Sequence, residues 1–220
     1  IRLRRALTRC PRNTNSVHMT LWSAGAAATL GRDHAVLRRN RQDAAAACAT
    51  VHGAFGVVSD GCGEGCSSEV GALLTVALAR AALARGLACE LELEAIARLC
   101  ANEVELGLAK LARSIPQQGR MAVVHEHLLA TLVGFVARGG EAVLFAAGDG
   151  VWLANDTTRV LEQGNRPLYP AYGLAGTRVP LLVEHVRAAD RLAVSTDGLE
   201  PRELSGLSHC APAALGRRLV

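Results

Sequence analysis

Three aspartates occupy the same kind of position in the sequence: each follows a short apolar run and precedes a glycine. They are Asp60, Asp149 and Asp197. A single Asp-Gly pair after a strand is most often a hairpin turn, because both residues tolerate positive φ. Three such pairs favour a different interpretation. Strands that lie side by side and end in carboxylates would gather negative charge at one edge of a sheet.

Gathered carboxylates repel one another unless a cation offsets their charge. Oxygen ligands suit the hard divalent ions Mg²⁺ and Mn²⁺, and such a site needs no His or Cys ligand. A glycine directly after each aspartate leaves its backbone carbonyl unshielded, so that this oxygen can join the coordination shell. The spacing therefore predicts a Mg²⁺ or Mn²⁺ site where the strand ends meet.

The elements that must position these aspartates are grouped along the chain rather than alternating, which favours an α+β fold over a doubly wound sheet. Apolar and β-branched runs predict strands within residues 19–30, 50–60, 127–136, 142–155 with a break at 148–150, 159–161 and 191–196. Residues 138–141 read as a hairpin connection, and residues 163–176 read as a loop.

Two amphipathic helices are expected between the strand groups. The first begins after Ser67 or Ser68 and ends near Gly86. Its expected buried stripe is Val70, Leu73, Leu74, Ala77, Leu78 and Ala81. The second spans about residues 90–113, with the stripe Ile96, Leu99, Cys100, Val104, Leu108 and Leu111. We expect both helices to lie together on a sheet.

Length and composition bound the class of protein. The chain has 220 residues, of which 50% are hydrophobic and 20% charged, so it is long enough for one globular domain with a sizeable core. Uncharged apolar runs, such as Val70 to Ala79, fall short of the roughly 20 residues that a membrane span needs. We therefore expect no transmembrane helix and no membrane partner.

Basic residues and cysteines give weaker indications. The formal net charge is +4, and the first dozen residues contain the arginines Arg2, Arg4, Arg5, Arg9 and Arg12. These arginines fit a nucleic-acid or targeting arm or a solvated tail. We favour a basic tail that spans residues 1–18, followed by a domain that spans residues 19–220, and we expect no nucleic-acid partner. Seven cysteines without a secretory signal indicate a reducing cytoplasm.

Other metal sites have less support. Cys62 and Cys66 lie in a Gly-rich loop, but a zinc site would need two more ligands at suitable spacing. His125 and His127 would share one face of a strand, a spacing that metals use but that surface residues also show.

Five segments together resemble the metal-dependent Ser/Thr protein phosphatases of type 2C, in particular their bacterial members. The segments are RRNRQDA (38–44), VVSDGCGEGCSSEVGA (57–72), LLATLVGFV (128–136), VLFAAGDGVWLAN (143–155) and DRLAVSTDGLE (190–200). The likeness covers about residues 21–200 and rests on the order of the motifs. It implies a four-layer α-β-β-α sandwich, in which two antiparallel sheets are flanked by helix pairs and hold two metal ions, or three, at one end.

The resemblance also implies roles for individual residues. Asp60 would bridge two metal ions, Gly61 would offer its carbonyl oxygen, and Asp197 would hold one ion from the other sheet. Asp149 matches the aspartate that helps to hold a weaker additional ion.

Two further matches concern the substrate and the water. Asp43 matches an aspartate expected to orient metal-bound water, and Arg38 matches the arginine that binds the phosphate. The implied activity is hydrolysis of phosphoserine and phosphothreonine in protein substrates of Ser/Thr kinases, in signal transduction. We expect a monomer.

Three departures leave an alternative open. Gln42 stands where many members have an acid, Cys62 stands where eukaryotic members have a proposed general-acid His, and the last strand with its metal-binding Asp has no match after Asp197. We expect the sequence to be truncated before that strand. The alternative is a non-catalytic type 2C-like module that binds a phosphoprotein or signalling partner, and a third interpretation is a structural β-rich domain with Asp-Gly hairpins.

Overall fold

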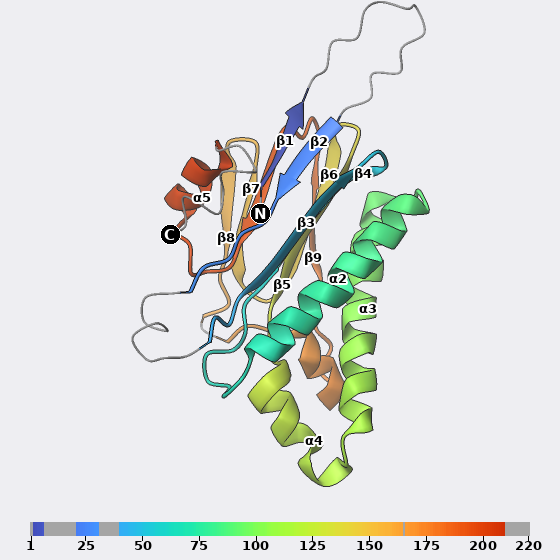
Figure 1. The fold of residues 1–220 in the computed structure, drawn as a ribbon, viewed down its shortest axis with the longest axis vertical. Coiled ribbons are helices and arrows are strands. Elements are labelled where there is room, and N and C mark those ends of the chain that lie inside the picture. The colour runs from blue at the N-terminus through green and yellow to red at the C-terminus, as the bar shows by residue number, and fades with distance from the viewer. Residues whose placement is uncertain (1, 7–20, 31–39, 165, 210–220) are drawn as a thin grey trace, which may run out of the picture.

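Two antiparallel sheets of five strands each form the framework of the protein (Figure 1). The computed structural model describes residues 2–6, 21–30, 40–164 and 166–209. The first sheet has the order β2 (Leu21–Gly25), β1 (Arg2–Ala6), β10 (Arg191–Ser195), β7 (Gly150–Ala154) and β8 (Thr157–Leu161). The second has the order β3 (Ala44–Thr50), β4 (Gly53–Ser59), β5 (Leu132–Arg138), β6 (Glu141–Ala147) and β9 (Leu182–Val186). The expected α+β class with antiparallel sheets is confirmed.

The two sheets pack face to face over an apolar core. Phe135 and Leu144 of the second sheet meet Trp152 and Leu192 of the first, and all four are at most 1% exposed. Every residue of β4 is buried, because one face of this strand meets the first sheet and the other meets the helices. A strand covered on both faces reads as a continuous apolar run, as residues 53–58 do.

Helices lie on the outer faces of both sheets (Figure 1). The long helices α2 (Glu69–Ala88) and α3 (Leu93–Ser114) pack on each other and on the second sheet. Helix α5 (Pro201–Ser208) contacts β10, β7 and β8 on the opposite side. Within the described residues the first sheet therefore carries this one helix, and the second helix pair expected from the resemblance is not seen.

Shorter elements connect these layers. Helix α4 (Gln117–Val123) leads into the π-helix η1 (Val124–Leu128), and a 3₁₀ helix, η2 (Pro170–Ala175), lies inside the expected loop 163–176. The hairpin at residues 138–141 is confirmed, with Arg138 opposite Glu141 and Gly139 at φ 67°.

The buried face of α2 differs from the expected one. Val70 and Leu73 are 40% and 55% exposed, whereas Ala79 and Leu83 are fully buried. Apolar residues surround this Ala-rich helix on nearly all sides, so their spacing does not single out a face. Helix α3 has a polar side, and there the expected stripe residues Ile96, Cys100, Val104 and Leu108 are buried, although Leu111 is 39% exposed.

Helix α2 is long enough and apolar enough to cross a membrane, by length and composition alone. The short uninterrupted apolar run Val70 to Ala79 did not indicate this. Arg80 and Arg85 lie on its exposed side. Half of its apolar window is buried inside the protein, against α3 and the strands β3 and β4. This packing is that of a core helix.

Some strand expectations were wrong. Residues 124–128 form η1, so β5 begins later than expected, and β3 and β9 were not predicted. Residues 2–6 form β1, which pairs with both β10 and β2, so a tail over residues 1–18 is wrong for this part. Residues 7–18 lie outside the described residues.

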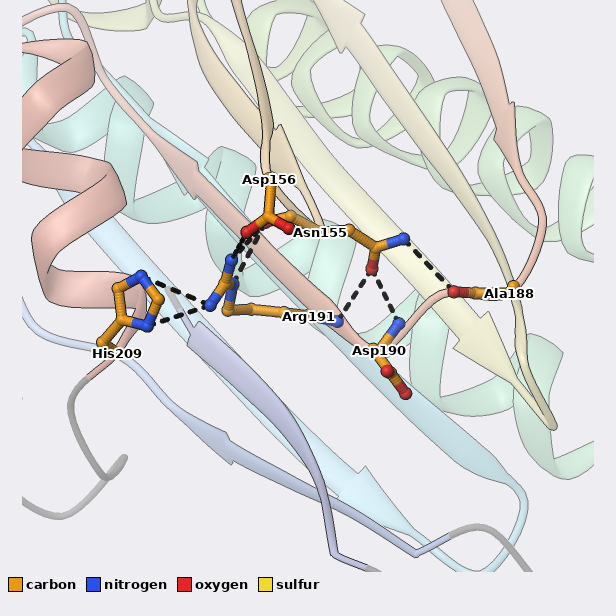
Figure 2. A network of polar contacts seen from close by, with 6 residues as sticks. All are labelled: Asn155, Asp156, Ala188, Asp190, Arg191 and His209. Carbon is orange, nitrogen blue, oxygen red and sulfur yellow. Dashed lines mark hydrogen bonds and ion pairs between the residues drawn. The ribbon is translucent and has the colours of Figure 1, made fainter.

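A polar network fixes one end of the first sheet (Figure 2). The Asn155 side chain accepts hydrogen bonds from the backbone N–H groups of Asp190 and Arg191, at 2.9 and 3.2 Å. The Arg191 guanidinium donates to the Asn155 carbonyl oxygen, pairs with Asp156 and lies 3.0 Å from Nδ1 of His209 at the end of α5. The network joins the β7–β8 turn to the start of β10, and thereby sets where the other end of β10 lies.

Two leucines of α2 test the observed orientation of that helix. Leu83→Ala should lower the free energy of unfolding by about 2–5 kcal/mol, because Leu83 is fully buried. Leu73→Ala should change it by less than about 0.5 kcal/mol. Urea unfolding followed by circular dichroism measures both, and equal losses for the two variants would contradict the observed face.

Candidate metal centre

Four aspartates lie at one end of the sandwich because of strand register. In the second sheet Ala44 pairs with Ser59 and Leu132 pairs with Ala147, so Asp43, Asp60 and the β6–β7 turn with Asp149 share one edge. In the first sheet Val151 pairs with Ser195, which brings the segment after β10, with Asp197, to the Asp149 turn. The structure thus gathers aspartates from both sheets, as the three Asp-Gly pairs predicted.

Asp60 is the electrostatic centre of this group. Burial, followed by the charges of Asp43, Asp197 and Asp149, raises the pKa of Asp60 from 3.8 to about 8, and the Asp43 and Asp60 side chains are hydrogen-bonded. The pKa of Asp149 is also raised, mainly by burial. Removing a carboxylate from water and placing it near others disfavours its charged form, so this end of the molecule is suited to a cation.

Thr131, directly before β5, holds Asp60 in place. Its backbone N–H donates to the Asp60 carbonyl oxygen at 2.8 Å, and its Oγ1 accepts from the Asp60 N–H at 2.9 Å. The Ser59 hydroxyl donates to the Thr131 carbonyl oxygen. Thr131 is 1% exposed and 71 residues from Asp60 in the chain, so no local sequence pattern indicated this contact.

The glycine after Asp60 is required by close packing. A Cβ at Gly61 would lie 2.6 Å from the carbonyl oxygen of Ser68, at the start of α2. The Gly61 N–H donates to the Gln42 carbonyl oxygen at 3.2 Å. Gly61 therefore brings the turn, the segment before β3 and the start of α2 together behind Asp60.

Gln42 is tied to the same region. Its side chain is buried and donates to Ser68 Oγ at 2.8 Å. An open cleft beside it is lined by Asn40, Gln42, Gly63, Glu64, Gly65, Cys66 and Glu69. The amide of Gln42 thus links the segment before β3 to the start of α2.

The donor set fits a hard divalent cation, because it consists of carboxylate and backbone oxygens on rigid strand ends. Among the residues that the structure describes, no three His, Cys, Asp or Glu side chains converge into a compact metal-binding cluster. This holds for the aspartates as well as for Cys62 with Cys66 and for His125 with His127. The aspartates differ from the other two sets because their charges act strongly on one another.

Two remaining expectations have different outcomes. Arg38 lies within residues 31–39, outside the described part of the chain. His125 and His127 lie on η1 rather than on a strand.

Tyr169 belongs to the site and was missed in the sequence. It is 7% exposed, its hydroxyl is hydrogen-bonded to the Cys62 side chain, and burial, that bond and the charges of Asp149 and Asp60 raise its pKa. Its ring packs edge to face on Tyr172, with centroids 5.5 Å apart. A tyrosine in an expected loop gives no sequence signal for such a position.

Thr131→Val should destabilise the fold by about 1–3 kcal/mol, because it leaves the Asp60 N–H without its acceptor in a buried place. Thr131→Ser keeps the oxygen and is the matched control. Urea unfolding compares the two variants. Equal stability of both would show that the hydroxyl does not hold Asp60.

In EDTA, wild-type protein should lose stability as the pH rises from about 4 to 8. Over this window the unfolded chain has already released the Asp60 proton, whereas the folded protein still binds it. Asp60→Asn cannot titrate, so its melting temperature should fall less over the same window and exceed that of wild type at pH 8. Parallel melting curves against pH for the two proteins would contradict the charge repulsion.

Comparisons with known proteins agree with this fold. Residues 30–171 match the family description Protein phosphatase 2C. None of the curated proteins compared with the chain matches it in sequence.

Solved structures with a similar fold include three bacterial proteins. Stp1 from Staphylococcus aureus is 14% identical, with a TM-score of 0.60, over 89% of each chain. PppA from Pseudomonas aeruginosa is 21% identical, with a TM-score of 0.56, over 82% of each chain. The catalytic domain of PstP, a structure with two manganese ions, is 19% identical, with a TM-score of 0.53, over 90% of this chain and 86% of that one. The matched profile spans well over half of the sequence and the sandwich is shared, so the chain belongs to the protein phosphatase 2C family.

Proposed function

We propose that this protein is a metal-dependent phosphatase that hydrolyses phosphoserine and phosphothreonine in protein substrates. The observation that carries the proposal is the meeting of Asp43, Asp60, Asp149 and Asp197 at one end of the sandwich, with Asp60 at the centre of their repulsion. The presence of two manganese ions in the related PstP domain supports the choice of metal. Counterpart Ser/Thr kinases and a cytoplasmic location are part of the proposal.

The residues have distinct roles in this proposal. Asp60 and Asp197, with the Gly61 carbonyl oxygen, would hold two Mg²⁺ or Mn²⁺ ions, and Asp149 would help to hold an additional one. Such ions, when bound, lower the pKa of water so that hydroxide forms near neutral pH, and they stabilise the charge that develops on the phosphate.

Other residues would orient the water, bind the phosphate and support Asp60. Asp43, which is hydrogen-bonded to Asp60, would orient the attacking water. Arg38 would grip two phosphate oxygens with its guanidinium fork. Thr131 keeps the Asp60 backbone fixed, so that its carboxylate does not have to reorganise during the reaction.

A second candidate is a non-catalytic module that keeps the fold and binds a phosphoprotein or signalling partner. One observation favours it: Gln42, at a position where many members have an acid, is hydrogen-bonded to Ser68. Its amide therefore supports α2 instead of adding negative charge to the site. Turnover separates the two candidates, because both allow a ligand to bind.

The protein should hydrolyse p-nitrophenyl phosphate and a phosphothreonine peptide in the presence of Mn²⁺, and EDTA should abolish both activities. Asp60→Asn should lower kcat/KM by about 100- to 1000-fold, because a metal ion supplies several kcal/mol of transition-state stabilisation. Glu162→Gln, an exposed acid outside the cluster, is the matched control. Undiminished activity in Asp60→Asn would refute the phosphatase, and Mn²⁺ binding without turnover would favour the module.

A further inference from the structure

We propose that Gln163 and Tyr169 form a strap that fixes the Asp149 turn against the Asp60 turn and so sets the affinity of the divalent-cation site that includes Asp149. The strap is defined as Gln163, Leu168 and Tyr169, which lie between β8 and η2. The proposal rests on the proposed function and assigns positioning roles to two residues that the resemblance does not include.

Gln163 is tied to the Asp149 turn. Its side-chain N–H donates to the Gly148 carbonyl oxygen at 3.4 Å, and its side-chain oxygen accepts from the Leu168 N–H at 2.6 Å. One amide thus joins the peptide group directly before Asp149 to the other end of the strap. Gly148 has φ 105°, a conformation open to glycine, and its freedom makes an outside contact important for fixing the turn.

Tyr169 is tied to the Asp60 turn. Its ring and Cys62, two residues after Asp60, pack in the same apolar cluster, and the hydroxyl and the Cys62 side chain are hydrogen-bonded. The Cys62 N–H in turn donates to the Leu129 carbonyl oxygen at 2.9 Å, ahead of β5. The Tyr169 end of the strap is therefore held in the core.

The segment after Tyr169, η2, is also held in place, by helix α3. In η2, a Cβ at Gly173 would meet the Glu105 carboxylate of α3, and η2 and α3 pack against each other. A strap held at this end and bonded to Gly148 at the other can limit the movement of Asp149 relative to Asp60.

The affinity of a metal site depends on how well its ligands are held in position. Loss of a supporting contact typically weakens metal binding about 10- to 100-fold, through ligands that sample more positions. Thr131 already supports both turns, since a Cβ at Gly148 would lie 2.8 Å from its methyl carbon. Because Thr131 remains in strap variants, we expect a smaller effect than this range, about 3- to 10-fold.

Calorimetric titration of the full chain with MnCl₂ tests the strap. Asp149→Asn identifies the ion whose binding needs Asp149. Gln163→Met and Tyr169→Phe should each lower the affinity for that ion about 3- to 10-fold and leave the affinity for the more tightly bound ions unchanged. The melting temperature of each metal-free variant should stay near that of wild type. Tyr172→Phe makes the same chemical change on the neighbouring ring and should bind Mn²⁺ as wild type does.

A double variant sharpens the result. In the Asp149→Asn background, Gln163→Met should have no further effect on Mn²⁺ binding, because the strap acts through Asp149. Wild-type affinity in both single strap variants would overturn the strap and leave the proposed phosphatase standing. A uniform weakening of all Mn²⁺ binding with a lowered melting temperature would also overturn it, as a general structural effect. Absence of Mn²⁺ binding in wild type would overturn the strap and the proposed function together.

Discussion

Repulsion among carboxylates at one end of the sandwich is the constraint that the rest of the structure must satisfy. Asp60 is largely removed from water and also lies among three other aspartates, so its pKa rises to about 8. A protein that needed only stability would not keep such a group, because burying like charges together is unfavourable without a counter-ion. The arrangement is therefore best understood as preparation for divalent cations.

The surrounding elements hold this unfavourable group in place. Antiparallel register brings the ends of β4, β6 and β10 to one edge, and the Asn155–Arg191 network fixes β10 from its far end. Thr131, directly before β5, anchors the Asp60 backbone, and the absence of a side chain at Gly61 lets the start of α2 pack against the Asp60 turn. The core between the sheets supplies the rigidity that these contacts need, since packed interiors do not deform continuously.

The sequence predicted the parts of the fold that depend on local patterns. The Asp-Gly pairs located three strand ends, and the polar side of α3 revealed its buried stripe. The buried face of α2 was predicted wrongly because apolar residues surround that helix, and β3 was missed because alanine has little preference for strands. Thr131 and Tyr169 could not be predicted, because contacts over long chain separations arise only from the register of the folded sheets and the path of the loop.

The most direct test of this account is anomalous diffraction at the manganese edge from crystals of the protein soaked in MnCl₂. We expect anomalous peaks beside Asp60 at the end of the sandwich, with the carboxylate of Asp197 turned toward one of them. Peaks confined to the molecular surface, with the aspartates placed as they are without metal, would contradict the central claim that cations balance these charges.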